Sequence, residues 1–420
     1  METTMQSPFT EFHDPDTAKE LVQRVISDPE EARWRSGRAL SRSTNPDVRG
    51  QAVRLLNSYL KDPESDIDIR TAYRITLALR LLQRPLPPDD VEIMRGYGAR
   101  FRPESTGVSS YASEEEFPVI DVHVHPKEPD GILLTEMLYA GIRHAVILAT
   151  DTDPVDLERE EIRDRIHANY TRSDVADHMS FDEVLQQIGD SLYSPGHVTN
   201  QDIADWINDY PGQLTGFGSI DLCRDPAYVE KTLTWLSQRP FRGIKLLPFS
   251  QFFDPETNEN MDLLMSWCRR QHWTILTHSG CAPGVFEDPL MNPDSRPSLW
   301  SGAASRYPDV PIILAHFGAY GRKHRGYWFE DALDTMRKHE NIWADTAAVW
   351  GMMSEEEVIQ KIRTSVGFDR VLFGSDYPVS RVMPGKTAGV VRYYLANVLL
   401  TDSEKRKILH DNAAELLNLQ

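Results

Sequence analysis

From Phe117 onward, apolar runs of strand length alternate with amphipathic helical segments, and this alternation constrains the fold more than any other feature of the sequence. Short apolar strands separated by helices are typical of parallel sheets, because a parallel connection has to cross the sheet. The predicted strands are eight in number: Val119–His123, Ala145–Ala149, Leu214–Ile220, Gly243–Leu247, Thr274–Thr277, Ile312–Ala315, Ile342–Asp345 and Val371–Gly374.

Helical segments separate most of these strands, and two more follow the last strand. Eight strands that alternate with helices predict an α/β fold of the (β/α)8 TIM-barrel type. An open doubly wound sheet is the alternative, but its first turn often carries a glycine fingerprint. Here the first turn reads His-Val-His-Pro, so we expect no dinucleotide site. The predicted helices are Gln201–Asp209, Ala227–Ser237, Met261–Gln271, Ser298–Tyr307, Trp328–His339, Ser354–Thr364, Gly385–Leu400 and Ser403–Leu417.

Residues 1–116 lack this alternation of strands and helices. Their sequence pattern predicts an all-helical N-terminal domain with its linker. Apolar residues recur at helical spacing from Val48 to Leu60, with a proline on either side of this segment. Residues 103–116 are rich in Ser, Glu and Gly, as linkers often are. The predicted domains are therefore 1–116 and 117–420.

The connection between the second and third strands is too long for a barrel loop. Only the last part of residues 150–213 is the expected helix, so about 151–199 form an insertion of mixed helical and polar character. Because the insertion leaves a strand at its carboxyl end, we expect it to lie over the catalytic face and to shape substrate access.

Polar residues follow the ends of four predicted strands. Alternate residues of a strand point the same way, so His123 and His125 are expected to project together. His278, His316 and Asp376 follow the fifth, sixth and eighth strands. A single buried histidine more often has a structural role, but five titratable groups at one mouth would be costly to bury without a metal or substrate.

Composition narrows the class of protein. The chain has 420 residues and a formal net charge of −19, which argues against binding to nucleic acid or to an anionic membrane. No apolar run approaches the ~20 residues that span a bilayer, and the N-terminus lacks a signal-peptide core. The three cysteines are too few for a disulfide framework, so we expect a cytoplasmic protein.

Four motifs resemble the amidohydrolase superfamily: the His-x-His of the first strand, Thr-His-Ser-Gly at 277–280, Ala-His-Phe-Gly at 315–318 and Phe-Gly-Ser-Asp-Tyr-Pro at 373–378. Within it, the chain is similar to the amidohydrolase-related branch (amidohydrolase 2), which includes the aminocarboxymuconate semialdehyde decarboxylase type. The ending at 408–417 is also similar. The resemblance covers Phe117 to Leu417 but neither the N-terminal helices nor most of the insertion.

The resemblance implies that His123, His125, His278 and Asp376 hold one divalent metal, most often zinc in this branch. It also implies that His316 is the acid/base beside the metal. Three imidazoles and one carboxylate suit Zn²⁺, and a water in the remaining position would make the site catalytic. Either Asp376 or His316 could then take the proton of the attacking water.

Three basic residues are candidates for binding substrate or supporting the site. Lys245 lies within the predicted fourth strand and is expected to be deeper in the barrel than the other candidates. An inward lysine that pairs with a carboxylate or contacts substrate is therefore favoured over a carboxylated lysine that bridges two metals. Arg322 and Arg381 follow the sixth and eighth strands and could bind a substrate carboxylate, although solvated loops are equally consistent.

The sequence thus predicts a metal-dependent hydrolase that acts on a small molecule, such as a lactone, an amide or a carboxylated substrate. One alternative is a metal-dependent decarboxylase of an aromatic or unsaturated acid. Another is a catalytically silent barrel whose N-terminal domain binds a partner. The substrate, the identity of the metal and any homo-oligomeric state are left open.

Overall fold

The computed structural model describes residues 118–126, 131–192, 198–382 and 386–419, together with residues 19, 22–23, 51–52, 54–56 and 58. The chain divides into two compact units, residues 1–111 with 130–135 and residues 112–129 with 136–420. Most of the predicted N-terminal domain lies outside the described residues. Those described there are helical, and the domain boundary at 116 stays a prediction.

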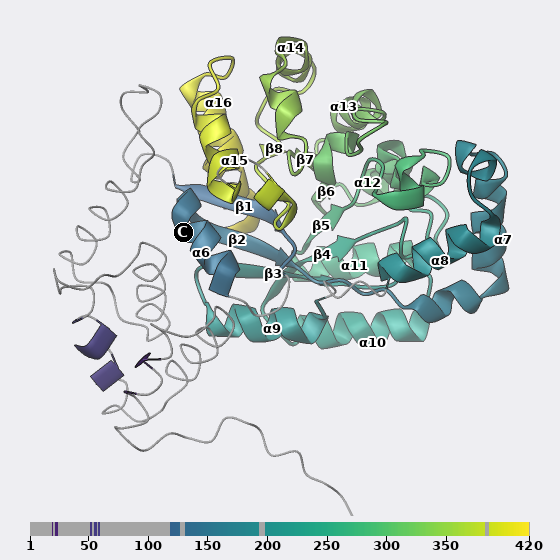
Figure 1. Ribbon diagram of the computed structural model, residues 1–420, viewed down its shortest axis with the longest axis horizontal. Helices are drawn as coiled ribbons and strands as arrows, with labels where there is room; N and C mark the ends of the chain where they lie inside the picture. The colour runs from purple at the N-terminus through teal and green to yellow at the C-terminus, as the bar shows by residue number, and fades with distance from the viewer. Residues whose placement is uncertain are drawn as a thin grey trace, which may run out of the picture. The chain divides into compact units, whose positions relative to one another are not determined.

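The second unit is built around one sheet of eight parallel strands that pair in chain order (Figure 1). The sheet comes close to closing on itself, because the Val122 N–H donates to Phe373 O (3.0 Å) and the His125 N–H donates to Tyr377 O (2.8 Å). This confirms the predicted TIM barrel. The strands are β1 Val119–Val124, β2 Ile142–Leu148, β3 Leu214–Ser219, β4 Phe241–Leu246, β5 Thr274–Thr277, β6 Ile312–Leu314, β7 Ile342–Asp345 and β8 Val371–Leu372.

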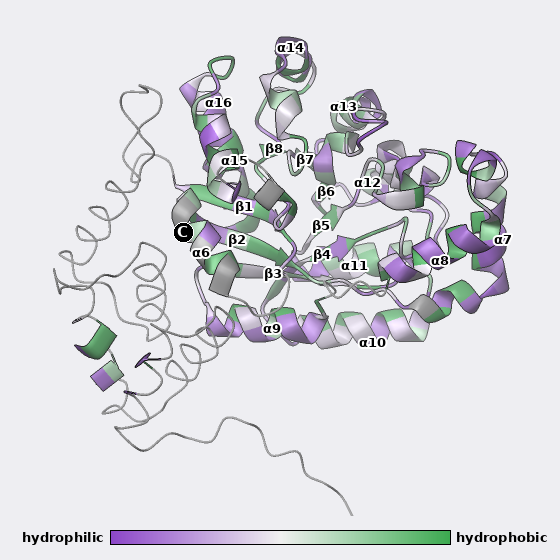
Figure 2. Cartoon of the chain, in the orientation of Figure 1, coloured by the Kyte–Doolittle hydropathy of each residue, from purple (hydrophilic) through white to green (hydrophobic). Residues whose placement is uncertain are grey.

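Helices follow the strands, and several begin at side chains that cap them. Thr199 and Asp202 form a capping box at the start of α9. Asp225 precedes α10, and its side chain accepts from the backbone N–H groups of Ala227 and Tyr228. Purple and green residues alternate along α9 and α10, as expected of amphipathic helices (Figure 2). The helices are α6 Gly131–Ala140, α9 Asn200–Asp209, α10 Pro226–Ser237, α11 Met261–Gln271, α12 Ser301–Arg306, α13 Phe329–Lys338, α14 Glu356–Ser365, α15 Lys386–Leu395, α16 Asp402–Arg406 and α17 Asn412–Leu417.

The sequence prediction differs from the structure in a few elements. Helix α6 was not predicted. The predicted strand Val371–Gly374 is shorter in the structure, where β8 ends at Leu372. The Phe373 N–H donates to Ile408 O (2.9 Å) and not to a neighbouring strand. The predicted last helix is interrupted by a π-helical turn at Lys407–Asp411. None of the helices that the structure describes is long and apolar enough to cross a membrane.

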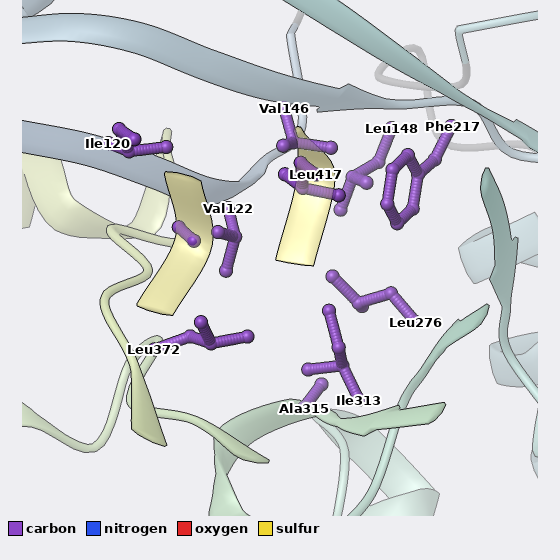
Figure 3. Packing of buried hydrophobic residues seen from close by; sticks show 11 residues of the cluster. Ile120, Val122, Val146, Leu148, Phe217, Leu276, Ile313, Ala315, Leu372 and Leu417 are labelled. Atoms are coloured by element: carbon purple, nitrogen blue, oxygen red, sulfur yellow. The ribbon is translucent and has the colours of Figure 1, made fainter. Parts of the chain in front are cut away.

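Apolar side chains from six strands pack together in the core of the barrel. Figure 3 shows Val122, Leu276, Ile313 and Leu372 pointing toward one another, with Leu417 of α17 among them. Helix α17 packs against β1 and β8, and its buried residues Ala413 and Leu417 belong to this core. His123, Lys245 and Asp345 lie near the carboxyl ends of β1, β4 and β7, where a barrel of this type carries its site.

The insertion has a small hydrophobic core of its own. It contains the 3₁₀ helices η1 Pro154–Glu158 and η2 Asp174–Asp177 and the helices α7 Glu160–Tyr170 and α8 Phe181–Leu192. Residues of α7 and α8 bury against Phe252 after β4 and against Val285 and Phe286 after β5. The insertion is therefore packed onto the loops that leave the carboxyl ends of β4 and β5.

We predict that Ile188→Ala, on the buried face of α8, lowers the free energy of unfolding of the protein by about 2–5 kcal/mol. Ile188 is fully buried in this small core, and truncation leaves a cavity there. Urea denaturation measures the change. The exposed neighbour Gln186→Ala is the control and should change stability by no more than about 0.5 kcal/mol. An Ile188→Ala variant as stable as wild type would contradict the packing of the insertion.

Candidate metal centre

Three side chains predicted as ligands converge at the carboxyl end of the barrel. His123 Nε2 lies 3.1 Å from His125 Nε2, and Asp376 Oδ1 lies 3.6 Å and 3.8 Å from these two nitrogens. Tetrahedral bonds of ~2.1 Å to one zinc ion would place ligand atoms ~3.4 Å apart. The donor types and their spacing therefore fit a single divalent ion.

The strand that carries the two histidines is irregular. The pairing of β1 with β2 shifts register between Asp121 and Val124, and such irregularities commonly re-aim side chains beside functional sites. Asp121 supports this bend, because its Oδ1 accepts from the His123 N–H (3.1 Å) and from the Ser375 N–H (2.9 Å). Asp121 thereby ties β1 to the segment that leads to Asp376.

Asp345, the last residue of β7, orients the site, a role that was not predicted from the sequence. Its Oδ2 accepts from His123 Nδ1 (2.8 Å), and its Oδ1 accepts from the backbone N–H of His316 (2.8 Å) and of Ala347 (3.0 Å). Because Nδ1 of His123 carries the proton, Nε2 keeps the lone pair that a metal needs. The available signal was positional, since Asp345 ends a strand just as the other candidates do.

His278 and His316 lie beside the three converging ligands but are held differently. His316 donates through Nδ1 to Ala347 O (2.9 Å), and His278 donates through Nε2 to Cys281 O (3.0 Å). Among the described residues, His316 groups with His123 and Asp345, whereas His278 joins no set of close ligand atoms. The structure thus brings together three of the four predicted ligands, and His278 lies next to them with its ring 4.9 Å from that of His316.

Burial keeps these imidazoles neutral. It lowers the pKa of His123 and His316 well below 6.5, and the pKa of His278 falls to about 3 for the same reason, aided by the charge of Lys245. His316 also has left-handed backbone angles (φ 59°), as does Asp376 (φ 49°). Such conformations are rare for residues other than glycine and tend to persist at functional sites.

Lys245 reaches the site from β4. It is fully buried, and its Nζ donates to His123 Nε2 over 3.3 Å. Burial lowers the pKa of the lysine, and the charges of Asp345 and Asp376 act in the opposite direction. Lys245 is thus turned toward the candidate ligands, and its hydrogen bond is made to an imidazole.

The remaining basic candidates lie at the rim. Arg322 is exposed, and its backbone N–H binds Glu287 Oε1. Arg381 lies in the 3₁₀ helix Val379–Val382, and its side chain is outside the described residues. Two aromatic rings that the sequence analysis did not select, Phe249 and Tyr320, contact His278 with centroids 4.8 Å and 5.8 Å away.

A second group of potential ligand atoms, in Asp156, Asp221 and Cys223, belongs to the attachment of the insertion. The guanidinium of Arg224 pairs with Asp156 (3.2 Å) and with Asp221 (3.3 Å). Arg159 lies 3.8 Å from the same oxygen of Asp156 and donates to Cys223 O (2.7 Å). The two arginines supply the positive charge here, so this group joins η1 to the loop after β3.

Comparison with known proteins identifies a family and a fold. The family model described as "Amidohydrolase" matches residues 120–419. The uncharacterized protein y4mH of Sinorhizobium fredii is 29% identical over an alignment of 119 residues that covers 26% of this chain and 40% of that protein. The chain thus matches about two fifths of the length of this curated relative.

Solved structures share the barrel at low sequence identity. An uncharacterized TIM-barrel protein from Bordetella bronchiseptica is 17% identical, with a TM-score of 0.50 over 72% of this chain and 99% of that one. A probable 2-pyrone-4,6-dicarboxylic acid hydrolase from Acinetobacter baumannii (13% identity, 71% and 99% covered) and a 2,6-dihydroxybenzoate decarboxylase (15%, 72% and 100%) each have a TM-score of 0.47.

We predict that the carboxyl group of Asp121 makes the metal-depleted protein less stable as the pH rises from about 4 to about 7, and that Asp121→Asn removes this contribution. Burial raises the pKa of Asp121 from 3.8 to about 7. Between these values the unfolded state has lost the proton and the folded state keeps it, so each such group lowers stability by ~1.4 kcal/mol per pH unit. Asparagine has the same shape and can accept the same two N–H bonds.

Urea denaturation with a chelator at pH 5 and pH 8 measures this effect. Relative to wild type, Asp121→Asn should gain about 2–3 kcal/mol of stability at pH 8 compared with pH 5, because the other groups titrate alike in both proteins. The exposed Asp190→Asn serves as the matched control and should leave the difference in stability between the two pH values unchanged. An unaltered pH dependence in Asp121→Asn would show that Asp121 is ionised in the folded state.

Proposed function

The chain belongs to the amidohydrolase family, and from this premise we propose that it is a metal-dependent hydrolase that uses an activated water to cleave a small carbonyl substrate. The observation that carries the proposal is the convergence of two imidazole nitrogens and one carboxylate oxygen within 4.8 Å of one another at the mouth of the barrel. Neutral His316 lies beside them, with its ring 4.8 Å from that of His123.

We assign the metal to His123, His125 and Asp376, with His278 as the fourth ligand through Nδ1. The Nε2 of His278 is engaged with Cys281 O, so Nδ1 is the nitrogen with a lone pair. When bound, a divalent ion polarises a substrate oxygen and lowers the pKa of its water toward ~7. Zinc suits these donors, and the spacing of the ligand atoms does not select it over other divalent metals.

His316 is the proposed acid/base. Its Nδ1 donates to Ala347 O, so Nε2 carries the lone pair that can take a proton from the attacking water. The same nitrogen can then return the proton to the leaving group. The carboxylate of Asp345 binds both the backbone N–H of His316 and the ring of His123. These two bonds hold the proposed base at a fixed distance from the proposed ligand.

Asp376 and Lys245 set the charge of the site. Burial raises the pKa of Asp376, and the ammonium of Lys245 opposes this rise. A buried lysine beside the ligands also offers a positive charge to an oxygen of the substrate. At the rim, Arg322 and Arg381 are the proposed partners of a substrate carboxylate.

The second candidate function is loss of carbon dioxide from an aromatic or unsaturated acid. The observation that favours it is the pair of aromatic rings, Phe249 and Tyr320, that contact His278, because flat rings suit a planar substrate. In this reaction a proton would be delivered to carbon, and His316 would again be its source.

Substrate profiling of metal-loaded protein distinguishes these functions. Hydrolysis of esters, lactones or amides without release of carbon dioxide supports the hydrolase, whereas carbon dioxide release from aryl acids supports the decarboxylase. Bound metal with no turnover on either panel would contradict both and leave the catalytically silent barrel.

We predict one divalent metal per chain, bound more weakly in Asp345→Asn. Loss of the carboxylate frees the ring of His123, and partners of this kind typically contribute ~10–100-fold to metal affinity. Elemental analysis gives the stoichiometry, and competition with a chromophoric chelator gives the affinity. Asp331→Asn, at a partly exposed carboxylate paired with Arg296, is the control. Two equivalents of metal, or a carboxylated Lys245, would refute the mononuclear site.

We predict that His316→Asn keeps its metal and loses most of its activity, whereas His278→Asn loses both. Removal of a general acid/base typically lowers the rate by ~10²–10⁴-fold, and a fifth protein ligand would crowd the position of the water. The two variants are compared side by side at saturating metal. If His316→Asn is isolated without metal, His316 is a ligand and Asp376 becomes the better candidate for the base.

A further inference from the structure

We propose that Tyr320 is a further catalytic residue, whose hydroxyl donates a hydrogen bond to the carbonyl oxygen of the substrate as negative charge develops on it. This inference rests on the proposed hydrolase function and deepens it, because it assigns an electrostatic role to a residue outside the ligand and acid/base set. It also narrows the substrate class to compounds that react through a tetrahedral oxyanion, namely esters, lactones and amides.

Tyr320 lies directly against the reacting groups. Its ring centroid is 4.6 Å from that of His316 and 5.8 Å from that of His278. A substrate carbonyl attacked beside His316 must therefore also lie beside Tyr320. The residue is partly buried, so a bound substrate would shield the hydroxyl from water and strengthen any hydrogen bond it makes.

The hydroxyl of Tyr320 is open to a ligand as far as the described residues show. In the part of the chain that the structure describes, it makes no hydrogen bond, whereas the hydroxyl of Tyr228 binds Asp151 (2.8 Å) and that of Tyr170 binds Met179 O (2.9 Å). The hydroxyl is thus a donor without an acceptor among the described residues.

The backbone holds this donor in place before any substrate binds. The Cys281 N–H donates to Tyr320 O (2.8 Å), and Gly280 pairs with Tyr320 in a parallel bridge. Gly280 has a φ of 104°, and a Cβ at this position would lie 2.6 Å from Tyr320 N. Only glycine allows this approach, by which the loop after β5 fixes Tyr320 next to His278.

A donor held in advance of the reaction stabilises the transition state more than the bound substrate. The hydroxyl keeps its proton throughout, so no group is transferred and His316 remains the acid/base. Loss of one such donor typically lowers the rate by ~10²–10³-fold. Affinity for a tetrahedral anionic analogue should fall with the rate, while KM changes little.

The test compares Tyr320→Phe with Tyr327→Phe in the full-length, metal-loaded protein. Both variants lose one phenolic hydroxyl from the same loop, but Tyr327 is 56% exposed and contacts Trp328 and His324. Phenyl acetate is the substrate probe, and phenyl methylphosphonate is the tetrahedral probe, with its affinity measured by calorimetry. Metal content is measured for every sample.

For Tyr320→Phe we expect kcat about 10²-fold lower, phosphonate affinity weakened in proportion, and unchanged metal content and KM. Tyr327→Phe should match wild type. Wild-type kcat or wild-type phosphonate affinity in Tyr320→Phe would overturn the assignment of Tyr320 alone, as would a change confined to KM. Absence of turnover by the wild-type protein on esters, lactones and amides would instead overturn the hydrolase proposal, and the assignment with it.

Discussion

The arrangement of the site depends on the carboxylate of Asp345. One oxygen accepts from the imidazole of His123, and the other accepts from the backbone N–H groups of His316 and Ala347. A single buried group at the end of β7 therefore fixes a side chain of β1 and the backbone after β6. These bonds satisfy a carboxylate that would otherwise be costly to bury.

Around this carboxylate, the barrel buries more ionisable groups than its own hydrogen bonds satisfy. Asp121 Oδ2 has no partner among the described residues, and burial raises the pKa of Asp121, Asp345 and Asp376. Lys245 supplies one positive charge to the interior. A bound dication would add more, and this electrostatic demand is the physical reason for the proposed metal centre, independent of the family to which the chain belongs.

Much of this could be predicted from the sequence, because strand periodicity and strand ends are local features. The eight apolar runs located all eight strands, and the carboxyl ends of these runs suggested the candidates His123, His125, His278, His316 and Asp376. The role of Asp345 could not be predicted in this way, since its partners lie 29 and 222 residues away in the chain. Nor could Tyr320, whose position depends on the contact that Gly280 allows between two loops.

The central claim is that one metal ion is held between His123, His125 and Asp376. A crystal structure of protein prepared with zinc, with anomalous data collected at the zinc edge, tests it most directly. The account predicts one peak per chain, at ~2.0–2.2 Å from His123 Nε2, His125 Nε2 and an Asp376 oxygen. A peak that lacks these contacts, or two peaks bridged by a modified Lys245, would contradict it.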